Sequence, residues 1–240
     1  AGIKGGWIDG FSAFSIKNTA LMVENEDGNP IISGEMVSCI NKPGVAEYLL
    51  DNLRLMLNKF EFDGLIWDEP HAEFCHCEFC RKKGIDSFEK AQDNFSSFLD
   101  MLSLESKQLR ENFICSVFVQ PHHAELLNAL LKTEHIDYIG SDGHLRSPDH
   151  KMHRMKPTIF EAYDKYAPLL KDAGKKSFFL LEGQRHRDED LANYLENLPG
   201  AFSLPMDQLM FYYTASEMSP ECDKIMTEAT WLAVAALETN

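Results

Sequence analysis

The 240-residue sequence contains no apolar run near the roughly eighteen residues that a membrane-spanning helix needs. Basic residues are also scarce: 23 Lys and Arg stand against 38 Asp and Glu, a formal net charge of −15. A chain of this charge has no basic surface for nucleic-acid phosphates and is not attracted to anionic lipid. We therefore expect neither a nucleic-acid partner nor a membrane partner.

The chain also begins without Met, without a signal peptide and without a polar leader. Residues 1–9 read Ala-Gly-Ile-Lys-Gly-Gly-Trp-Ile-Asp, as if Gly2 ended a helix that runs straight into a strand. We expect the domain to start before residue 1.

Short apolar runs alternate with longer amphipathic stretches along the whole chain. The runs predict strands over residues 5–11, 64–67, 113–119, 136–140, 177–181 and 208–213. Helices are predicted near residues 43–60, 86–102, 124–131, 157–174, 188–196 and 220–238. Regular alternation of this kind is typical of an α/β protein with a mostly parallel sheet. We treat residues 1–240 as one catalytic-type domain.

Six strands are two fewer than a (β/α)₈ TIM barrel requires. If two βα units precede residue 1, the visible strands are the third to the eighth of an N-terminally incomplete barrel. A doubly wound open sheet is the competing fold. It would carry a glycine-rich phosphate turn after a strand, and the sequence has none. The barrel is therefore our prediction.

Three of the six cysteines are crowded into Cys75-x-Cys77-x-x-Cys80. Such spacing suits a metal better than a disulfide framework, and tetrahedral zinc takes four soft ligands. Cys39, which lies just before the helix preceding the cluster, is the candidate fourth ligand. We expect one structural zinc, with an iron–sulfur cluster as the weaker alternative. The remaining cysteines, Cys115 and Cys222, are expected to be structural.

The surroundings of these cysteines resemble a known family. Cys39-Ile40-Asn41-Lys42-Pro43 precedes a helix, the next strand ends in an acid, and the three-cysteine loop follows. This order, over residues 36 to 85, is similar to that of the zinc-containing β-galactosidases of glycoside hydrolase family 42 and related glycoside-hydrolase-like TIM barrels. The resemblance implies a carbohydrate substrate and an acid/base Glu at the end of the fourth strand.

Two glutamates follow apolar strands and are the candidate catalytic pair. Glu69 comes after residues 64–68, and Glu182 comes after residues 177–181. Barrel active sites lie at the carboxyl ends of the strands, and retaining glycosidases use two carboxyl groups about 5–5.5 Å apart. With two units missing, these strands are the fourth and seventh, which the resemblance implies are the acid/base and nucleophile positions of the large barrel clan to which family 42 belongs.

Asp68 departs from the family pattern, which has Asn before the acid/base Glu. An ionised carboxylate cannot donate to a sugar hydroxyl, so a β-galactosidase specificity does not follow. A carboxylate beside Glu69 would raise the pKa of Glu69 if both side chains pointed inward, and this would suit a general acid. Asp68 itself remains an alternative acid.

Further polar and aromatic residues near the predicted strand ends are candidates for substrate binding, because aromatic faces stack on sugar rings and polar groups bond to hydroxyls. They are Trp7, Asp9, His71, Gln120, His122, Asp142, His144, Arg185 and Tyr213. His123 and His186 occupy similar positions, and Arg185 or His186 is expected to keep Glu182 ionised.

The sequence thus predicts a retaining glycoside hydrolase with a structural zinc. The alternative is a non-catalytic carbohydrate-binding or scaffold barrel descended from a glycosidase. A zinc hydrolase is disfavoured because four thiolates leave no open position for water. The sugar and linkage are not determined by the sequence, which also leaves homo-oligomerisation open and favours the cytoplasm over export.

Overall fold

The computed structural model describes residues 19–31, 37–70, 73–120, 124–151, 156–183, 185–212 and 218–238. Two compact units divide the chain, Ala1–Ile139 and Gly140–Asn240. The division falls inside one strand, β3 (Tyr138–Gly143).

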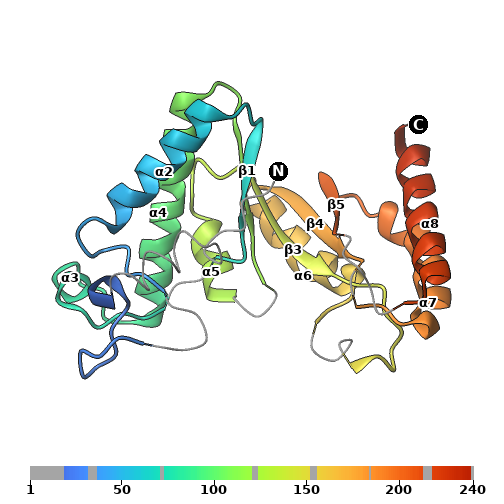
Figure 1. The fold of residues 1–240 in the computed structure, drawn as a ribbon, viewed down its shortest axis with the longest axis horizontal. Helices are drawn as coiled ribbons and strands as arrows, with labels where there is room; N and C mark the ends of the chain where they lie inside the picture. The colour runs from blue at the N-terminus through green and yellow to red at the C-terminus, as the bar shows by residue number, and fades with distance from the viewer. Residues whose placement is uncertain are drawn as a thin grey trace. The chain divides into compact units, whose positions relative to one another are not determined.

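The first unit joins two parallel strands to a layer of helices. Its elements, in chain order, are η1 (Thr19–Leu21), α2 (Val45–Lys59), β1 (Gly64–Asp68), α3 (Glu78–Lys82), α4 (Phe88–Leu109), β2 (Ile114–Phe118) and α5 (Ala124–Leu130). Strand β1 pairs with β2, with Leu65 opposite Cys115. Helices α2 and α4 pack side by side (Figure 1), and Leu53, Leu57 and Leu102 bury their apolar faces beside the strands.

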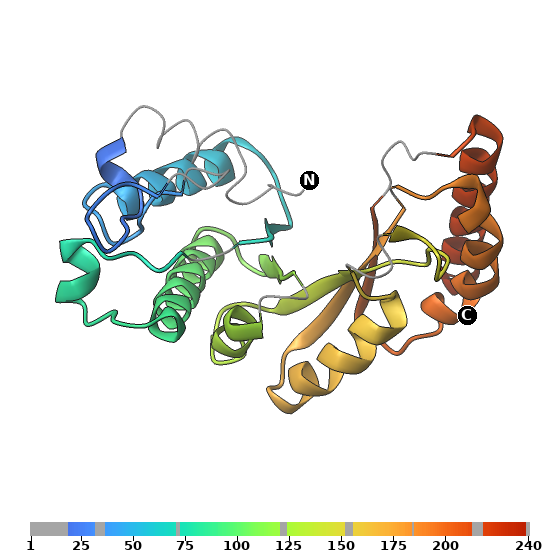
Figure 2. The same ribbon diagram turned by 90° about the horizontal axis from the view of Figure 1, so that it is seen from below.

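The second unit also combines parallel strands with helices. It holds β4 (Lys176–Glu182), β5 (Gln208–Tyr212), α6 (Ile159–Asp172), η3 (Asp188–Asp190), α7 (Leu191–Phe202) and α8 (Pro220–Glu238). Strands β4 and β5 are parallel, with Phe179 opposite Leu209. Helix α6 packs on β4, and α7 packs on α8 (Figure 2). Between these two helices the Tyr194 hydroxyl lies 2.8 Å from Thr230 Oγ1.

Helix ends follow the local capping chemistry. Thr158 begins α6 with a capping box, in which its hydroxyl accepts from Glu161 N–H and the Glu161 carboxylate accepts from Thr158 N–H. Past the end of α6, Gly174 adopts φ 68°, the left-handed conformation that glycine takes without strain. The two ends of α6 are therefore defined by its own sequence.

The order of the strands in the sheet distinguishes a barrel from a doubly wound sheet. The five described strands form one sheet in the order β1-β2-β3-β4-β5, which follows the chain. A doubly wound sheet reverses its strand order at a switch point, whereas a barrel adds each strand beside the previous one. The α/β prediction is confirmed, and the order favours part of a barrel. The strand predicted at residues 5–11 lies outside the described residues.

Some details differ from the sequence prediction: α4 continues to Leu109 instead of ending near residue 102, and β3 spans Tyr138–Gly143 instead of residues 136–140. Helix α3 was not predicted, because five residues are too few to show a helical period. Helix α7 continues to Phe202 instead of ending near residue 196, since buried Leu198 and Ala201 extend its apolar face past Pro199. Among the described residues, no helix combines the length and apolarity needed to span a membrane.

Candidate metal centre and candidate active site

Four cysteines of the first unit meet at the N-terminal end of α3. Cys75 and Cys77 precede the helix, Cys80 lies in its first turn, and Cys39 comes from the segment before α2. Cys77 is the N-cap residue, and its sulfur accepts a hydrogen bond from Cys80 N–H at 3.5 Å. This cap brings the side chains of Cys77 and Cys80 close together.

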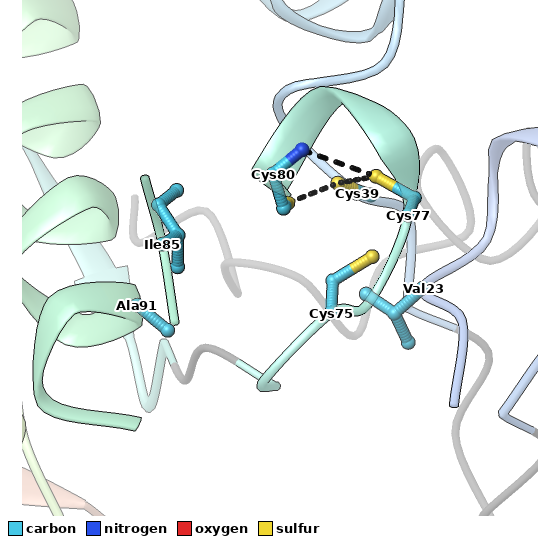
Figure 3. Close-up of a cluster of buried hydrophobic side chains, with 7 residues drawn as sticks. All are labelled: Val23, Cys39, Cys75, Cys77, Cys80, Ile85 and Ala91. Carbon is cyan, nitrogen blue, oxygen red and sulfur yellow. Dashed lines mark hydrogen bonds between the residues drawn. The ribbon is translucent and has the colours of Figure 1, made fainter. Parts of the chain in front are cut away.

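The sulfur atoms have the spacing of a metal site (Figure 3). Cys39 Sγ lies 3.8 Å from Cys77 Sγ and 3.5 Å from Cys80 Sγ, and all four sulfur atoms lie within 4.8 Å of one another. A tetrahedron with zinc–sulfur bonds of about 2.3 Å has corners about 3.8 Å apart. All four side chains are buried. This Cys₄ cluster, predicted from the spacing, could therefore hold one metal ion.

Within the cluster, Cys75 is the cysteine whose thiolate form is favoured. Hydrogen bonds from the thiols of Cys39 and Cys80 favour a thiolate at Cys75 and lower the pKa of Cys75. The pKa of Cys39 is raised, because its thiol donates to that neighbour and a second negative charge nearby is unfavourable. Cys115 lies apart in β2, where burial raises its pKa to about 11, as expected of a structural cysteine.

The predicted acid/base residue lies at the end of β1. Glu69 directly follows the strand, and its N–H donates to the Phe118 carbonyl oxygen at 3.0 Å. Its backbone φ is 47°, a left-handed conformation that costs energy in a residue with a side chain. Asp68 and Glu69 are both half-buried. The first unit thus holds a strained carboxylate residue at a strand end.

The second predicted carboxylate, Glu182, is the last residue of β4 and is only 2% exposed. Arg146 Nη2 lies 2.6 Å from its Oε2, and Lys156 Nζ donates to its Oε1. The Arg146 side chain is fully buried. Both oxygens of Glu182 are therefore bound to cations that come from the segment between β3 and α6.

A second carboxylate shares one of these cations. Asp142, in β3, is 1% exposed, and its Oδ2 lies 2.5 Å from Lys156 Nζ. Its other oxygen, Oδ1, is buried and has no hydrogen-bond partner among the residues that the structure describes. We refer to Asp142, Arg146, Lys156 and Glu182 as the charge cluster.

The two carboxyl groups of the charge cluster have pKa values that are shifted in opposite directions. Burial and the neighbouring Glu182 raise the pKa of Asp142 to about 7. Burial alone would also raise the pKa of Glu182, but hydrogen bonding with Asp142 and the charges of Arg146 and Lys156 lower it to about 2. Glu182 is the carboxylate that stays ionised.

His144 holds the segment that supplies the cations. Its Nδ1 accepts from Arg146 N–H at 3.1 Å, so the ring is neutral and Nε2 donates to the Lys156 carbonyl oxygen at 3.0 Å. The same segment is bound from the other side by Asp190, whose Oδ1 accepts from Ser147 N–H. Both ring nitrogens of His144 are thus engaged with backbone, which makes it a positioning residue for Arg146 and Lys156.

The other predicted site residues have varied positions. Gln120 is half-buried after β2. Arg185 is exposed with φ 58°, and the cations on Glu182 are instead Arg146 and Lys156, so the expected pairing with Arg185 was wrong. His186 is buried with its ring against Tyr194. The remaining candidates lie outside the described residues: Trp7, Asp9, His71, His122, His123 and Tyr213.

Sequence reasoning missed Arg146 and Lys156. They lie in a polar stretch that carries several other basic residues and has no period. The only available signal was the position of Arg146 two residues after the strand-end candidate His144.

Comparison with known proteins shows a likeness of fold. No family model and no curated protein sequence matches the chain. Among solved structures, an α-L-fucosidase isoenzyme from Paenibacillus thiaminolyticus matches 99% of this chain with 11% identity and a TM-score of 0.62. A β-galactosidase from Rahnella sp. R3 matches 93% of it with 11% identity and a TM-score of 0.61.

A β-galactosidase from the psychrophilic Marinomonas ef1 matches 92% of the chain with 9% identity and a TM-score of 0.62. The chain spans 37%, 44% and 47% of the lengths of these three proteins. At such identities the likeness concerns the fold alone. The chain therefore has a fold similar to part of the TIM-barrel domain of glycoside hydrolases.

Proposed function

We propose that this chain is part of a retaining glycoside hydrolase in which Glu182 is the nucleophile and Glu69 the acid/base. One observation carries the proposal: Glu182, at the carboxyl end of β4, is buried and kept ionised by Arg146 and Lys156. Barrel enzymes place catalytic groups at such strand ends, and the fold resembles that of glycoside hydrolases.

The reaction then has two steps. A Glu182 carboxylate oxygen attacks the anomeric carbon, while Glu69 gives its proton to the departing glycosidic oxygen, so that a glycosyl ester forms and the alcohol leaves. In the second step Glu69 takes a proton from water, whose oxygen displaces Glu182 from the anomeric carbon. The mechanism requires carboxyl groups about 5–5.5 Å apart in the substrate complex.

The charge cluster supports the first step in two ways. Arg146 holds Oε2 of Glu182 from a fully buried position, which fixes the carboxylate and favours its ionised form. Lys156 has the more accessible side chain, 25% exposed, and is the cation that we expect to move when a sugar ring reaches Oε1.

Asp142 is the best supported of the proposed substrate-binding residues. Its buried Oδ1 offers an acceptor for a sugar hydroxyl. Gln120 is a second polar candidate, at the end of β2. Trp7, Asp9, His71, His122 and Tyr213 stay predictions, as does Arg185, while we assign His144 to positioning.

We further propose that the Cys₄ cluster holds a structural zinc. Four buried thiolates at near-tetrahedral spacing suit this ion and leave no coordination position for water. Its role is then to stabilise the segments that carry Cys39 and α3. Those segments flank β1, the strand that leads to Glu69.

A non-catalytic carbohydrate-binding barrel is the second candidate, and one observation favours it. Both oxygens of Glu182 are occupied by cations, and the residue is only 2% exposed. A carboxylate retained only for stability would look the same. The two candidates differ in whether Lys156 can release Glu182.

The deciding experiment replaces Glu182 by Ala and assays the protein on a panel of aryl glycosides, with Glu196→Ala on the exposed face of α7 as the control. We expect the Glu182 variant to lose turnover. Added azide should restore part of it with inverted configuration, because azide fills the vacated space and attacks the anomeric carbon directly.

Near-normal turnover of Glu182→Ala would overturn the assignment of the nucleophile. Azide rescue with retained configuration would exchange the roles of Glu182 and Glu69. Glycan binding by the wild type, together with no turnover of any aryl glycoside, would favour the binding module.

A further inference from the structure

N–H groups of the backbone and of one side chain point at sulfur atoms of the Cys₄ cluster. Glu24 N–H donates to Cys75 Sγ at 3.3 Å, and Cys80 N–H donates to Cys77 Sγ at 3.5 Å. The third donor is a side chain: Asn41 Nδ2 donates to Cys80 Sγ at 3.2 Å. Backbone donors are present whatever the side chain, so Asn41 is the one of these three donors that the sequence can change.

The orientation of the Asn41 amide is fixed by a second contact. Lys83 Nζ donates to Asn41 Oδ1 at 2.7 Å. An ammonium group can only donate, so the oxygen of the amide must face Lys83 and the nitrogen must face Cys80. Lys83 is the C-cap residue of α3, and its N–H donates to the carbonyls of Phe79 and Cys80.

Asn41 therefore connects the two halves of the ligand set. It lies two residues after Cys39, while its partners Cys80 and Lys83 both belong to the segment of α3. A hydrogen bond to an ionised acceptor is roughly twice as strong as a neutral one. The contact with Cys80 should consequently gain strength when the sulfur becomes a metal-bound thiolate.

We propose that Asn41 is a positioning residue of the metal centre, which orients the Cys80 thiolate and slows loss of the metal. Four thiolates around a dication leave two excess negative charges in a buried place, and a donor aimed at one sulfur reduces their cost. Lys83 acts through Asn41 by holding the amide. This inference rests on the proposed metal site.

The test compares variants of the full chain loaded with zinc. Asn41→Leu removes the donor at similar size, Asn41→Asp turns a carboxylate toward the thiolate, and Lys83→Met removes the group that orients the amide. The matched controls are Lys82→Met, whose ammonium pairs with Glu78 on the exposed side of α3, and Asn52→Leu on the exposed face of α2.

Zinc release to a chromophoric chelator is the first readout. We expect the Asn41 variants to release zinc about 10–100-fold faster than the wild type, the range typical for loss of a group that supports a metal ligand. Lys83→Met should show a smaller acceleration, and both controls should match the wild type. The sulfur-to-cobalt charge-transfer band of the cobalt-loaded protein should shift in the Asn41 variants alone.

Thermal melting with and without metal separates this role from simple packing. We expect Asn41→Leu to lower the Tm of the metal-loaded protein but not of the metal-free protein. An equal decrease in both forms, or release rates equal to that of the wild type, would overturn the inference while leaving the metal site in place. Wild-type protein that retains no metal would overturn the metal proposal itself, and the role of Asn41 with it.

Discussion

The Cys₄ cluster of the first unit and the charge cluster of the second differ in how buried negative charge can be neutralised. Both bring like-charged groups together in a buried place. The charge cluster supplies its own cations, Arg146 and Lys156, against Asp142 and Glu182. Among the described residues that surround the four sulfur atoms, no cation of the protein contacts a sulfur. One site is neutralised by the chain, and the other could hold a metal ion.

This difference has consequences for stability and for function. A site that depends on an external ion couples ion binding to folding. A site neutralised by its own side chains is stable without a ligand, but the mechanism that we propose requires one of its ion pairs to open before a substrate reaches the carboxylate. Four changes test the comparison, beginning with the largest expected effect.

Removal of the metal should destabilise the first unit most. Of the seven buried residues that form the core beside α3, four are the cysteines, so little apolar surface remains to hold that region without the ion. Structural zinc contributes an apparent binding free energy of about 10–16 kcal/mol in small zinc domains. We expect chelation to raise proteolysis and hydrogen exchange over residues 37–85, as followed by mass spectrometry.

Cys80→Ser should reproduce this effect, whereas Cys115→Ala should keep the metal, since Cys115 lies in β2 away from the cluster. Unchanged hydrogen exchange in a protein shown to be free of metal would contradict the coupling of metal to folding.

Glu182→Gln should destabilise the second unit without affecting metal content. It leaves the buried Arg146 and the half-buried Lys156 beside a neutral amide, and removal of one partner of a buried ion pair costs about 3–5 kcal/mol. Urea denaturation measures the loss. The double variant Arg146→Met/Glu182→Leu should recover part of it, because no uncompensated Arg146 charge remains; a double variant less stable than Glu182→Gln would argue against this account.

Glu69→Gln should affect turnover rather than stability. The residue is half-buried and has none of the buried ion pairs that hold Glu182 among the described side chains. If Glu69 is the acid, kcat for substrates with poor leaving groups should fall by about 10²–10⁴-fold. Substrates with good leaving groups should be cleaved nearly as before in the first step. An equal loss for both kinds of substrate would remove Glu69 from this role.

Asp142→Asn should have the smallest effect, and one that depends on pH. The pKa of Asp142 is raised from 3.8 to about 7 in the folded protein, so between these values the folded state binds more protons than the unfolded state. Asp142 therefore contributes less to stability as the pH rises from about 4 to about 7. Glu182 behaves in the opposite sense, because its lowered pKa stabilises above pH 4.5 and this gain is lost toward pH 2.

The difference in Tm between Asp142→Asn and the wild type should accordingly shift in favour of the variant between pH 4.5 and pH 8. Glu196→Ala serves as the control and should show no such trend. A difference that is constant across this range would mean that Asp142 ionises as an ordinary surface carboxylate does.

The order of the elements could be predicted from the sequence because each strand or helix has its own pattern of apolar residues. Strands β1 and β5 begin at the predicted residue, and α8 spans the predicted range. The Cys₄ cluster could also be predicted from a local pattern, since three of its cysteines lie within six residues. Glu182 was found because it ends an apolar strand.

The partners of Glu182 were decided only by the tertiary structure. Arg146 and Lys156 are 36 and 26 residues away from it, in a segment without a period, and its nearest sequence cation, Arg185, is exposed. Asn41 likewise meets Cys80 across 39 residues. The sequence by itself determined which groups are buried at the strand ends and in the cysteine loop, because burial follows local apolar patterns. Which residues neutralise these buried groups depends on the tertiary fold of loops that are distant in the sequence. Local hydrophobic patterns do not predict such long-range contacts.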